Sequence, residues 1–182
     1  MATMTGQPFE IRPAGPADLL FLADMLVEAV NWHPQRNWDR ARILSDPALA
    51  HYLTGWPGPG EAGALAEAAG TPGRTPAGTP VGAAWLRLLP ASDPGFGFVA
   101  EGIPELTIGV VASWRRRGVG RALLHALTAQ ARSAGVAGIS LSVERDNPAR
   151  ALYQQEGFRM IANDEGADIM LLDLSRYGSP GG

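Results

Sequence analysis

The sequence contains no cysteine among its 182 residues. This absence excludes disulfides, a cysteine nucleophile and thiolate metal sites, and it agrees with a reducing compartment. No apolar run reaches the ~20 residues that span a bilayer, because Asp24 and Glu28 interrupt the longest candidate, residues 19–30. The N-terminus, residues 1–8, lacks the basic and then apolar order of a signal peptide. We therefore expect a cytoplasmic protein that does not contact a membrane.

An excess of positive charge is also missing. The chain carries 15 basic and 18 acidic residues, which gives a formal net charge of -3. Without an overall positive field, binding to nucleic acid is not expected. Histidine is scarce as well, and His33, His51 and His125 show neither metal-ligand spacing nor a His-Glu-x-x-His pattern. We expect no bound metal.

The remaining composition is that of a globular protein, with 46% hydrophobic and 18% charged residues. The length suits one domain with a proper core, so we predict a single domain over residues 1–182. The ends, 1–8 and 175–182, are expected to be flexible. Repeated Gly and Pro residues predict a long hairpin loop at 69–80.

Hydrophobic periodicity predicts the order of the elements. The expected strands are 9–12, 63–68, 81–89, 105–111, 139–143, 159–162 and 168–174, and the expected helices are 16–30, 39–43, 47–53, 118–134 and 147–155. The strand–helix–strand units in the second half imply a central parallel pairing with right-handed crossovers. The predicted class is α/β (α+β), with a central mixed, twisted sheet of about six to seven strands flanked by helices.

Four aromatic residues are concentrated in the segment 31–57: Trp32, Trp38, Tyr52 and Trp56. Such a group either walls a substrate pocket or packs at the edge of the core. The loop at 90–102 likewise either lies over a site or only connects two strands. The sequence leaves both questions open.

The run Arg115-Arg116-Arg117-Gly118-Val119-Gly120 lies between a predicted strand and a predicted helix. Helix N-termini present unpaired N–H groups and partial positive charge. Two glycines let the backbone approach an anion closely, and guanidinium groups suit phosphate oxygens. The pattern favours a pyrophosphate cradle. The alternative is that Gly118 forms only a turn and that the arginines are a solvated rim.

Other phosphate-binding loops fit this run poorly. A dinucleotide fingerprint requires a third glycine at position 123, where Leu123 stands. The ATP- and GTP-binding loop requires Gly-Lys-Ser or Gly-Lys-Thr, and the segment has no lysine.

Two blocks together resemble the GNAT superfamily of N-acetyltransferases. The first is Arg115-x-x-Gly118-x-Gly120 after an apolar strand, and the second runs from Asn147 through Tyr153 to Gly157-Phe158. The strong resemblance covers about 55 residues, from 104 to 158, in the order found in that family. One departure is Arg116, where many members have glycine. The resemblance implies a GNAT-like fold in which the strands 105–111 and 139–143 splay apart.

The resemblance also assigns residues to coenzyme A. Backbone amides from Arg116 to Arg121 (Arg116, Arg117, Gly118, Val119, Gly120 and Arg121) would hold its pyrophosphate, and the side chain of Arg115 would add a contact. The backbone of Val110 and Val111 would pair with the pantetheine arm. An N–H near Val110 would polarise the acetyl carbonyl.

Three further roles follow from the resemblance, each with an alternative. Tyr153 is the expected general acid, or it only packs its ring against the coenzyme. Asn147 touches the coenzyme, or it only caps its helix. Glu105 is the expected general base; the alternatives are a solvated glutamate at a strand end and a water chain that replaces a side-chain base.

The function implied is an acyltransferase that moves an acetyl group from acetyl-coenzyme A to a primary amine by direct attack. The amine belongs to an unidentified small molecule or peptide, which would enter between the segment 32–56 and the loop before Glu105. Transfer to a hydroxyl is a weaker idea. The alternative is a non-catalytic acyl-coenzyme A sensor on the same fold. A homodimer would be unsurprising.

Overall fold

The computed structural model describes residues 8–70 and 75–175. The ends expected to be flexible lie outside this range except for Pro8 and Ser175, and so do residues 71–74 of the expected hairpin loop. The described residues of that loop lie between two strands that pair antiparallel.

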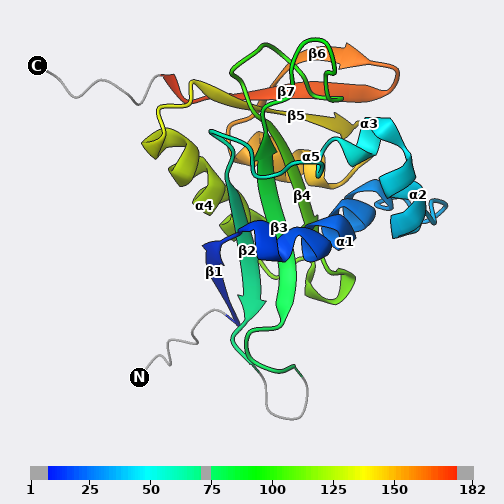
Figure 1. Ribbon diagram of the computed structural model, residues 1–182, viewed down its shortest axis with the longest axis vertical. Helices are drawn as coiled ribbons and strands as arrows, with labels where there is room; N and C mark the ends of the chain where they lie inside the picture. Colours follow the sequence, from blue (N-terminus) through cyan, green and yellow to red (C-terminus); the bar gives the residue numbers. More distant parts are fainter. Residues whose placement is uncertain (1–7, 71–74, 176–182) are drawn as a thin grey trace, which may run out of the picture.

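Seven strands form one mixed sheet in the order β1-β2-β3-β4-β5-β7-β6 (Figure 1). The strands are β1 (Phe9–Pro13), β2 (Gly63–Ala68), β3 (Pro80–Arg87), β4 (Glu105–Val110), β5 (Gly138–Glu144), β6 (Arg159–Asp164) and β7 (Ala167–Asp173). Neighbouring strands pair antiparallel except β4 and β5, which are parallel. The expected mixed sheet and its central parallel pair are confirmed.

Five α-helices cover the two faces of the sheet. They are α1 (Leu19–Val30), α2 (Arg40–Ser45), α3 (Pro47–Ala50), α4 (Val119–Ser133) and α5 (Ala149–Gln155). Helices α1 to α3 pack in one apolar cluster, centred on Trp85 of β3. Helices α4 and α5 pack in a second cluster with Leu86, Leu106 and Leu141. Because side chains alternate along a strand, Trp85 of β3 and Gly109 of β4 face α1, whereas Leu86 of β3 and Leu106 of β4 face α4.

The helix boundaries follow local capping. The Asp39 carboxylate accepts a hydrogen bond from the N–H of Arg42 at 2.8 Å, which starts α2. Asp46 does the same for α3 through the N–H of Ala48 at 3.0 Å, with Pro47 as the first helical residue. The third helix is shorter than predicted, since it ends at Ala50 and continues only as turns.

Helix α1 lies unusually close to β4. A Cβ on Gly109 would lie 2.3 Å from the carbonyl oxygen of Met25, so only glycine fits between the two backbones. This contact fixes the C-terminal half of α1 beside the C-terminal half of β4.

The parallel pair of β4 and β5 is joined at one end only. Its register contains a single residue pair, Glu105 with Ser140, supported by a hydrogen bond of 3.0 Å from the N–H of Ser140 to the oxygen of Pro104. Beyond this pair the two strands diverge toward Val110 and Glu144. The sheet therefore opens into a wedge, as the resemblance implied.

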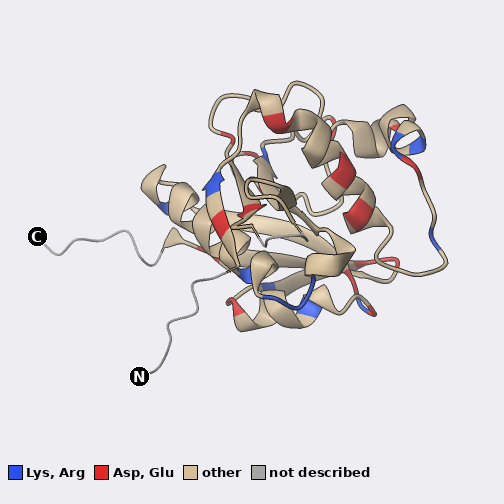
Figure 2. Cartoon of the chain, turned by 90° about the horizontal axis from the view of Figure 1, so that it is seen from below, with Lys and Arg blue, Asp and Glu red and all other residues tan. Residues whose placement is uncertain are grey.

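Acidic and basic residues are interspersed over the chain (Figure 2). In the described part of the chain, no helix is long and apolar enough to cross a membrane.

Candidate functional site

A cavity of about 860 Å³ follows the wedge between β4 and β5. One end lies at the start of α4, where Gly118, Gly120 and Arg121 line it. The other end lies under the loop between α1 and α2, where Trp32 and Trp38 line it. Glu105 and Tyr153 line the same cavity. The structure therefore joins the expected phosphate cradle to the expected catalytic residues in one space.

The chain enters α4 through two left-handed residues. Arg116 has φ +60° and Gly118 has φ +84°. Gly118 is the N-cap and supplies no side-chain cap, so the N–H groups of the first turn, from Val119 to Arg121, have no intrahelical acceptor. A Cβ on Gly120 would have its nearest contact at 3.6 Å, with Leu152, so this position borders open space. Unpaired backbone N–H groups, the positive end of a helix dipole and glycine positions without side chains are features that favour binding of an anion.

The arginines near this cradle have separate contacts. Arg115 donates to the carbonyl oxygen of Val110 at 3.1 Å and pairs with Glu28 at 2.5 Å. Arg121 contacts Gln155, the last residue of α5, and Glu156, which follows it, so the cradle is linked to the second sequence block. The guanidinium of Arg117 lies over the ring of Trp114 at 5.2 Å.

Three residues expected to bind the coenzyme do not line the cavity: Val111, Arg117 and Val119. The side chain of Val119 is buried in the core, so only its backbone is placed for such a role. The N–H of Val111 donates to the oxygen of Val81 at 3.0 Å. Its expected pairing with pantetheine through that N–H is therefore wrong, because the group is already engaged with β3.

Val110 differs from Val111 because hydrogen-bonding directions alternate along a strand. Val111 is bonded toward β3, so the N–H and C=O of Val110 point to the opposite side, into the wedge. The C=O of Val110 accepts from Arg115. The open edge of β4 thus offers the N–H of Val110 to the cavity.

Glu105 is not a solvated residue at a strand end, since only 4% of it is exposed. Its Oε1 accepts hydrogen bonds from the hydroxyl of Tyr52 at 2.7 Å and from the N–H of Gly97 at 2.8 Å. Its Oε2 has no hydrogen-bond partner in the described residues. Burial raises the pKa of Glu105 to about 6, although both hydrogen bonds act in the opposite direction. A buried carboxylate with one unoccupied oxygen and a pKa near neutrality can accept a proton.

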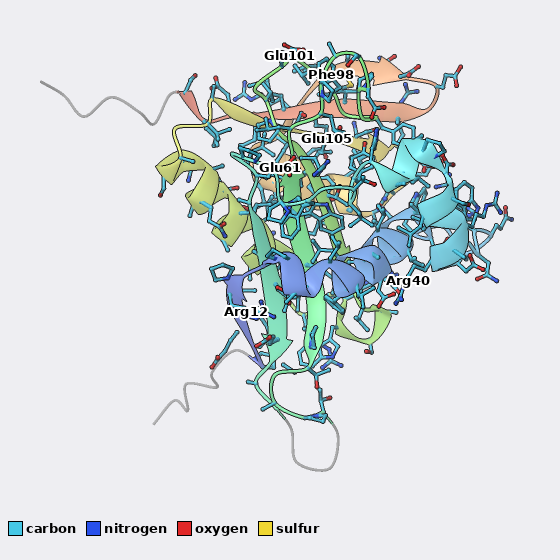
Figure 3. All side chains as sticks on the ribbon, viewed as in Figure 1. Arg12, Arg40, Glu61, Phe98, Glu101 and Glu105 are labelled. Atoms are coloured by element: carbon cyan, nitrogen blue, oxygen red, sulfur yellow. The ribbon has the colours of Figure 1, made fainter. Side chains whose placement is uncertain are left out.

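The loop between β3 and β4 closes over Glu105. Figure 3 shows Phe98 and Glu101 of this loop at the top of the molecule, with Glu105 beneath them. A Cβ on Gly95 would lie 2.0 Å from Oε2 of Glu105, and one on Gly97 would lie 2.5 Å from the backbone of Leu141. Two glycines therefore let the loop contact both the carboxylate and β5, so the loop covers the site instead of only connecting strands.

Tyr52 links this loop to the base. Its hydroxyl accepts a hydrogen bond from the N–H of Phe96 at 2.8 Å while it donates to Glu105. Its carbonyl oxygen accepts from the indole of Trp85 at 2.9 Å. Burial and the nearby Glu105 raise the pKa of Tyr52 above its usual value, so it remains a neutral donor. The sequence showed Tyr52 only as one of four aromatics, and nothing in its spacing indicated this contact.

Tyr153 is 7% exposed and packs against Phe158 with ring centroids 5.9 Å apart. Burial raises the pKa of its hydroxyl, which keeps the proton in place. No hydrogen bond to this hydroxyl occurs in residues 8–70 and 75–175. The arrangement combines ring packing with a protonated hydroxyl at the cavity.

Asn147 lies one residue before Pro148, the N-cap of α5. Its Oδ1 accepts a hydrogen bond from the N–H of Ala149, the first residue of the helix, at 2.9 Å, which agrees with a role at the helix start. The residue also lines the cavity, and a contact with a ligand remains a prediction.

Of the four aromatic residues in the segment 31–57, two are buried in the core and two are partly exposed at the cavity. Tyr52 and Trp56 are buried in the cluster around Trp85, so they pack in the core. Trp32 and Trp38 are partly exposed and line the cavity. Within the described ranges, no group of three or more His, Cys, Asp or Glu side chains could hold a metal ion.

A family model described as "Acetyltransferase (GNAT) family" matches residues 27–158, which is more than half of the chain. No curated protein sequence matches the chain. Among solved structures, a GCN5-related N-acetyltransferase from Kribbella flavida is 21% identical with a TM-score of 0.63, over 91% of this chain and 98% of its own. YncA, a putative acetyltransferase from Salmonella typhimurium with acetyl-CoA, is 23% identical with a TM-score of 0.62, over 95% and 98%.

A third similar structure is the PaiA N-acetyltransferase from Thermoplasma acidophilum in complex with coenzyme A. It is 17% identical with a TM-score of 0.61, over 91% of this chain and 98% of its own. At these identities the three structures support the fold.

Proposed function

The chain belongs to the GNAT family of acetyltransferases, and we propose that it transfers an acetyl group from acetyl-coenzyme A to a primary amine by direct attack. The observation that carries this proposal is the single cavity that runs from the free amides of α4 past Val110 to Glu105 and Tyr153. The two similar proteins with bound coenzyme A or acetyl-CoA support the choice of cosubstrate.

The start of α4 fits a pyrophosphate. Amides of the first turn and the backbone around Gly118 and Gly120 would hold its oxygens. Arg116 and Arg121 line this end of the cavity and add positive charge. Arg115 would have to exchange Glu28 for a phosphate oxygen, since the two are paired at 2.5 Å.

The open edge of β4 fits the pantetheine arm. The N–H of Val110 would point at the acetyl carbonyl oxygen and stabilise the negative charge that develops there. One such donor contributes roughly 3 kcal/mol to the transition state in related acyl transfers. Acetyl-coenzyme A itself supplies the reactive thioester.

We assign Glu105 as the general base. Its pKa of about 6 leaves it ionised at neutral pH while keeping it a useful proton acceptor. Tyr52 and Gly97 hold Oε1, so Oε2, which has no partner in the described residues and is buried beneath Gly95, is the oxygen that we assign as the proton acceptor, directly or through one water.

Tyr153 is the assigned general acid. The amine nitrogen forms a bond to the acetyl carbon, the carbon–sulfur bond breaks, and the amine proton passes to Glu105. The departing sulfur takes a proton from Tyr153, because burial raises the pKa of its hydroxyl and favours the protonated form before the reaction. Solvent then returns both residues to their starting states.

The test is release of free thiol from acetyl-coenzyme A in the presence of a broad panel of amines. We expect turnover with at least one amine and a product heavier by one acetyl group on nitrogen by mass spectrometry. Binding of acetyl-coenzyme A without turnover across the panel would contradict the enzyme assignment and favour an acyl-coenzyme A sensor. A product acetylated on oxygen would contradict the amine assignment.

A further inference from the structure

The end of the cavity farthest from α4 has aromatic walls. Four aromatic side chains line it: Trp32, Trp38, Tyr52 and Phe96. Leu26 and Leu49 add aliphatic surface. These residues come from α1, the loop after it, α3, the turn after α3 and the loop over Glu105. The region is called the acceptor end below.

Phe96 is the most unusual member of this group, because 59% of it is exposed at the edge of a cavity. Its ring is nearly parallel to that of Tyr52, with centroids 6.3 Å apart and an interplanar angle of 14°. An exposed aromatic face beside a concave apolar wall is a surface on which another flat apolar group gains by stacking.

The same stack is tied to the assigned base. The N–H of Phe96 donates to the hydroxyl of Tyr52, and that hydroxyl donates to Glu105. The apolar surface and the carboxylate are therefore held in one fixed arrangement. A group stacked on Phe96 would keep an attached amine close to Glu105.

The charges at the acceptor end are unsuited to a carboxylate. Arg36 is the arginine that lines this end, and both of its terminal nitrogens pair with Glu144, at 2.5 and 2.8 Å. Glu144 also accepts from the indole of Trp32 at 3.1 Å. Asp46 and Glu105 line the same region and have no arginine partner in the described residues. A carboxylate on the acceptor would meet net negative charge, whereas an ammonium group would be attracted.

We propose that the acceptor is an arylalkylamine-type molecule: a primary amine, separated by a short linker from a flat apolar group, without a carboxylate. The apolar group would stack against Phe96 and the tryptophan wall, and the amine would reach Glu105. This inference rests on the proposed function, since it specifies the acceptor of the same reaction.

The first experiment compares three amines at saturating acetyl-coenzyme A. 2-Phenylethylamine has the ring, the linker and the amine; phenylalanine adds a carboxylate to it; spermidine offers primary amines without an apolar group. We expect kcat/KM for 2-phenylethylamine to exceed that for spermidine by about 10- to 100-fold, the range for burial of one such ring. It should also exceed that for phenylalanine, because the added carboxylate meets net negative charge at the acceptor end.

The second experiment uses a matched pair of variants. Phe96→Ala removes the exposed ring but keeps the N–H that bonds to Tyr52. We expect KM for 2-phenylethylamine to rise about 10-fold with kcat little changed. Leu20→Ala is the control, because Leu20 is 71% exposed on α1 and does not line the cavity; it should leave KM unchanged.

The outcomes separate this inference from the proposed function. Turnover of spermidine or phenylalanine that equals or exceeds that of 2-phenylethylamine overturns the acceptor class and leaves acetyl transfer standing. An unchanged KM in Phe96→Ala overturns the stacking role. No thiol release with any amine, while acetyl-coenzyme A still binds, overturns both.

Discussion

The two ends of the cavity are built from different kinds of groups. At the α4 end, main-chain N–H groups and the bare backbone at Gly118 and Gly120 form the surface. At the acceptor end, side chains from distant segments form it, such as Trp38, Tyr52 and Phe96. Backbone groups in a fixed turn recognise any pyrophosphate, whereas side chains can change without altering the fold. An enzyme that uses the same cosubstrate as its relatives but its own acceptor would need backbone recognition at one end and side-chain recognition at the other.

The largest expected effect is at the α4 end. Gly120→Trp should place an indole in the open space near Leu152 and reduce coenzyme A affinity by at least ~100-fold, or about 3 kcal/mol. Isothermal titration calorimetry measures this directly. Gly120→Ala is the matched control, since an added Cβ would make only ordinary contact at 3.6 Å. Equal affinity in the Trp and Ala variants would place the pyrophosphate elsewhere.

Glu105 lies between the two ends of the cavity, and its substitution should have the next largest effect. Glu105→Gln should lower kcat by about 100- to 1,000-fold, the usual range for loss of a general base. Coenzyme A affinity should remain within about twofold, because the variant leaves the amide cradle intact. Steady-state kinetics and calorimetry together test the split. A near-normal kcat would show that a water chain or another group accepts the proton.

Tyr153→Phe should have a smaller effect on the same step. The ring still packs against Phe158, but the hydroxyl proton is lost, so kcat should fall by roughly 10- to 100-fold. Binding of acetyl-coenzyme A should change little. Wild-type turnover across the pH range would instead assign Tyr153 a packing role only.

Tyr52 lines the acceptor end and also contacts Glu105, so a substitution at Tyr52 tests whether it sets the pKa of the assigned base. Its hydrogen bond stabilises the ionised form of Glu105, so Tyr52→Phe should raise the pKa of Glu105 above its value of about 6. Wild-type kcat/KM should fall as the pH drops through about 6 and Glu105 becomes protonated. In the variant this fall should begin at higher pH, with a loss of ~10-fold at low pH for each pKa unit gained. If kcat/KM of the variant falls at the same pH as that of the wild type, Tyr52 does not position Glu105.

The smallest effect should come from Arg116. This residue has φ +60°, a left-handed conformation that costs a non-glycine residue about 1–2 kcal/mol. Arg116→Gly should therefore stabilise the fold by up to about 1 kcal/mol after the larger unfolded-state entropy of glycine is included. Thermal unfolding measures it. Arg117→Gly removes the same charge at a position without positive φ, and it should destabilise.

The α4 end could be predicted from the sequence because local chemistry determines it. The glycines at 118 and 120 are separated by one residue, and the arginines and the helix start beside them are evident from the same short run of sequence. The departure at Arg116 was visible too, but the sequence did not show that an arginine would keep the left-handed conformation there. Val111 was misplaced because one residue reverses the hydrogen-bonding direction of a strand, and the strand register is not visible in sequence.

The acceptor end could not be predicted in the same way. Tyr52 and Glu105 are separated by 53 positions, and their contact depends on how α3 packs on the sheet. The role of Gly95 and Gly97 was hidden because glycines in a loop usually indicate only a turn. Glu105 was identified from its place at the strand start, but its burial depends on the loop folding back over it.

The most direct test of the central claim is a crystal structure with acetyl-coenzyme A bound. The pyrophosphate oxygens should lie within about 3 Å of the N–H groups in the first turn of α4, and the thioester carbonyl oxygen should accept from the N–H of Val110. A cofactor bound away from the start of α4, or a thioester remote from Val110 and Glu105, would contradict the account.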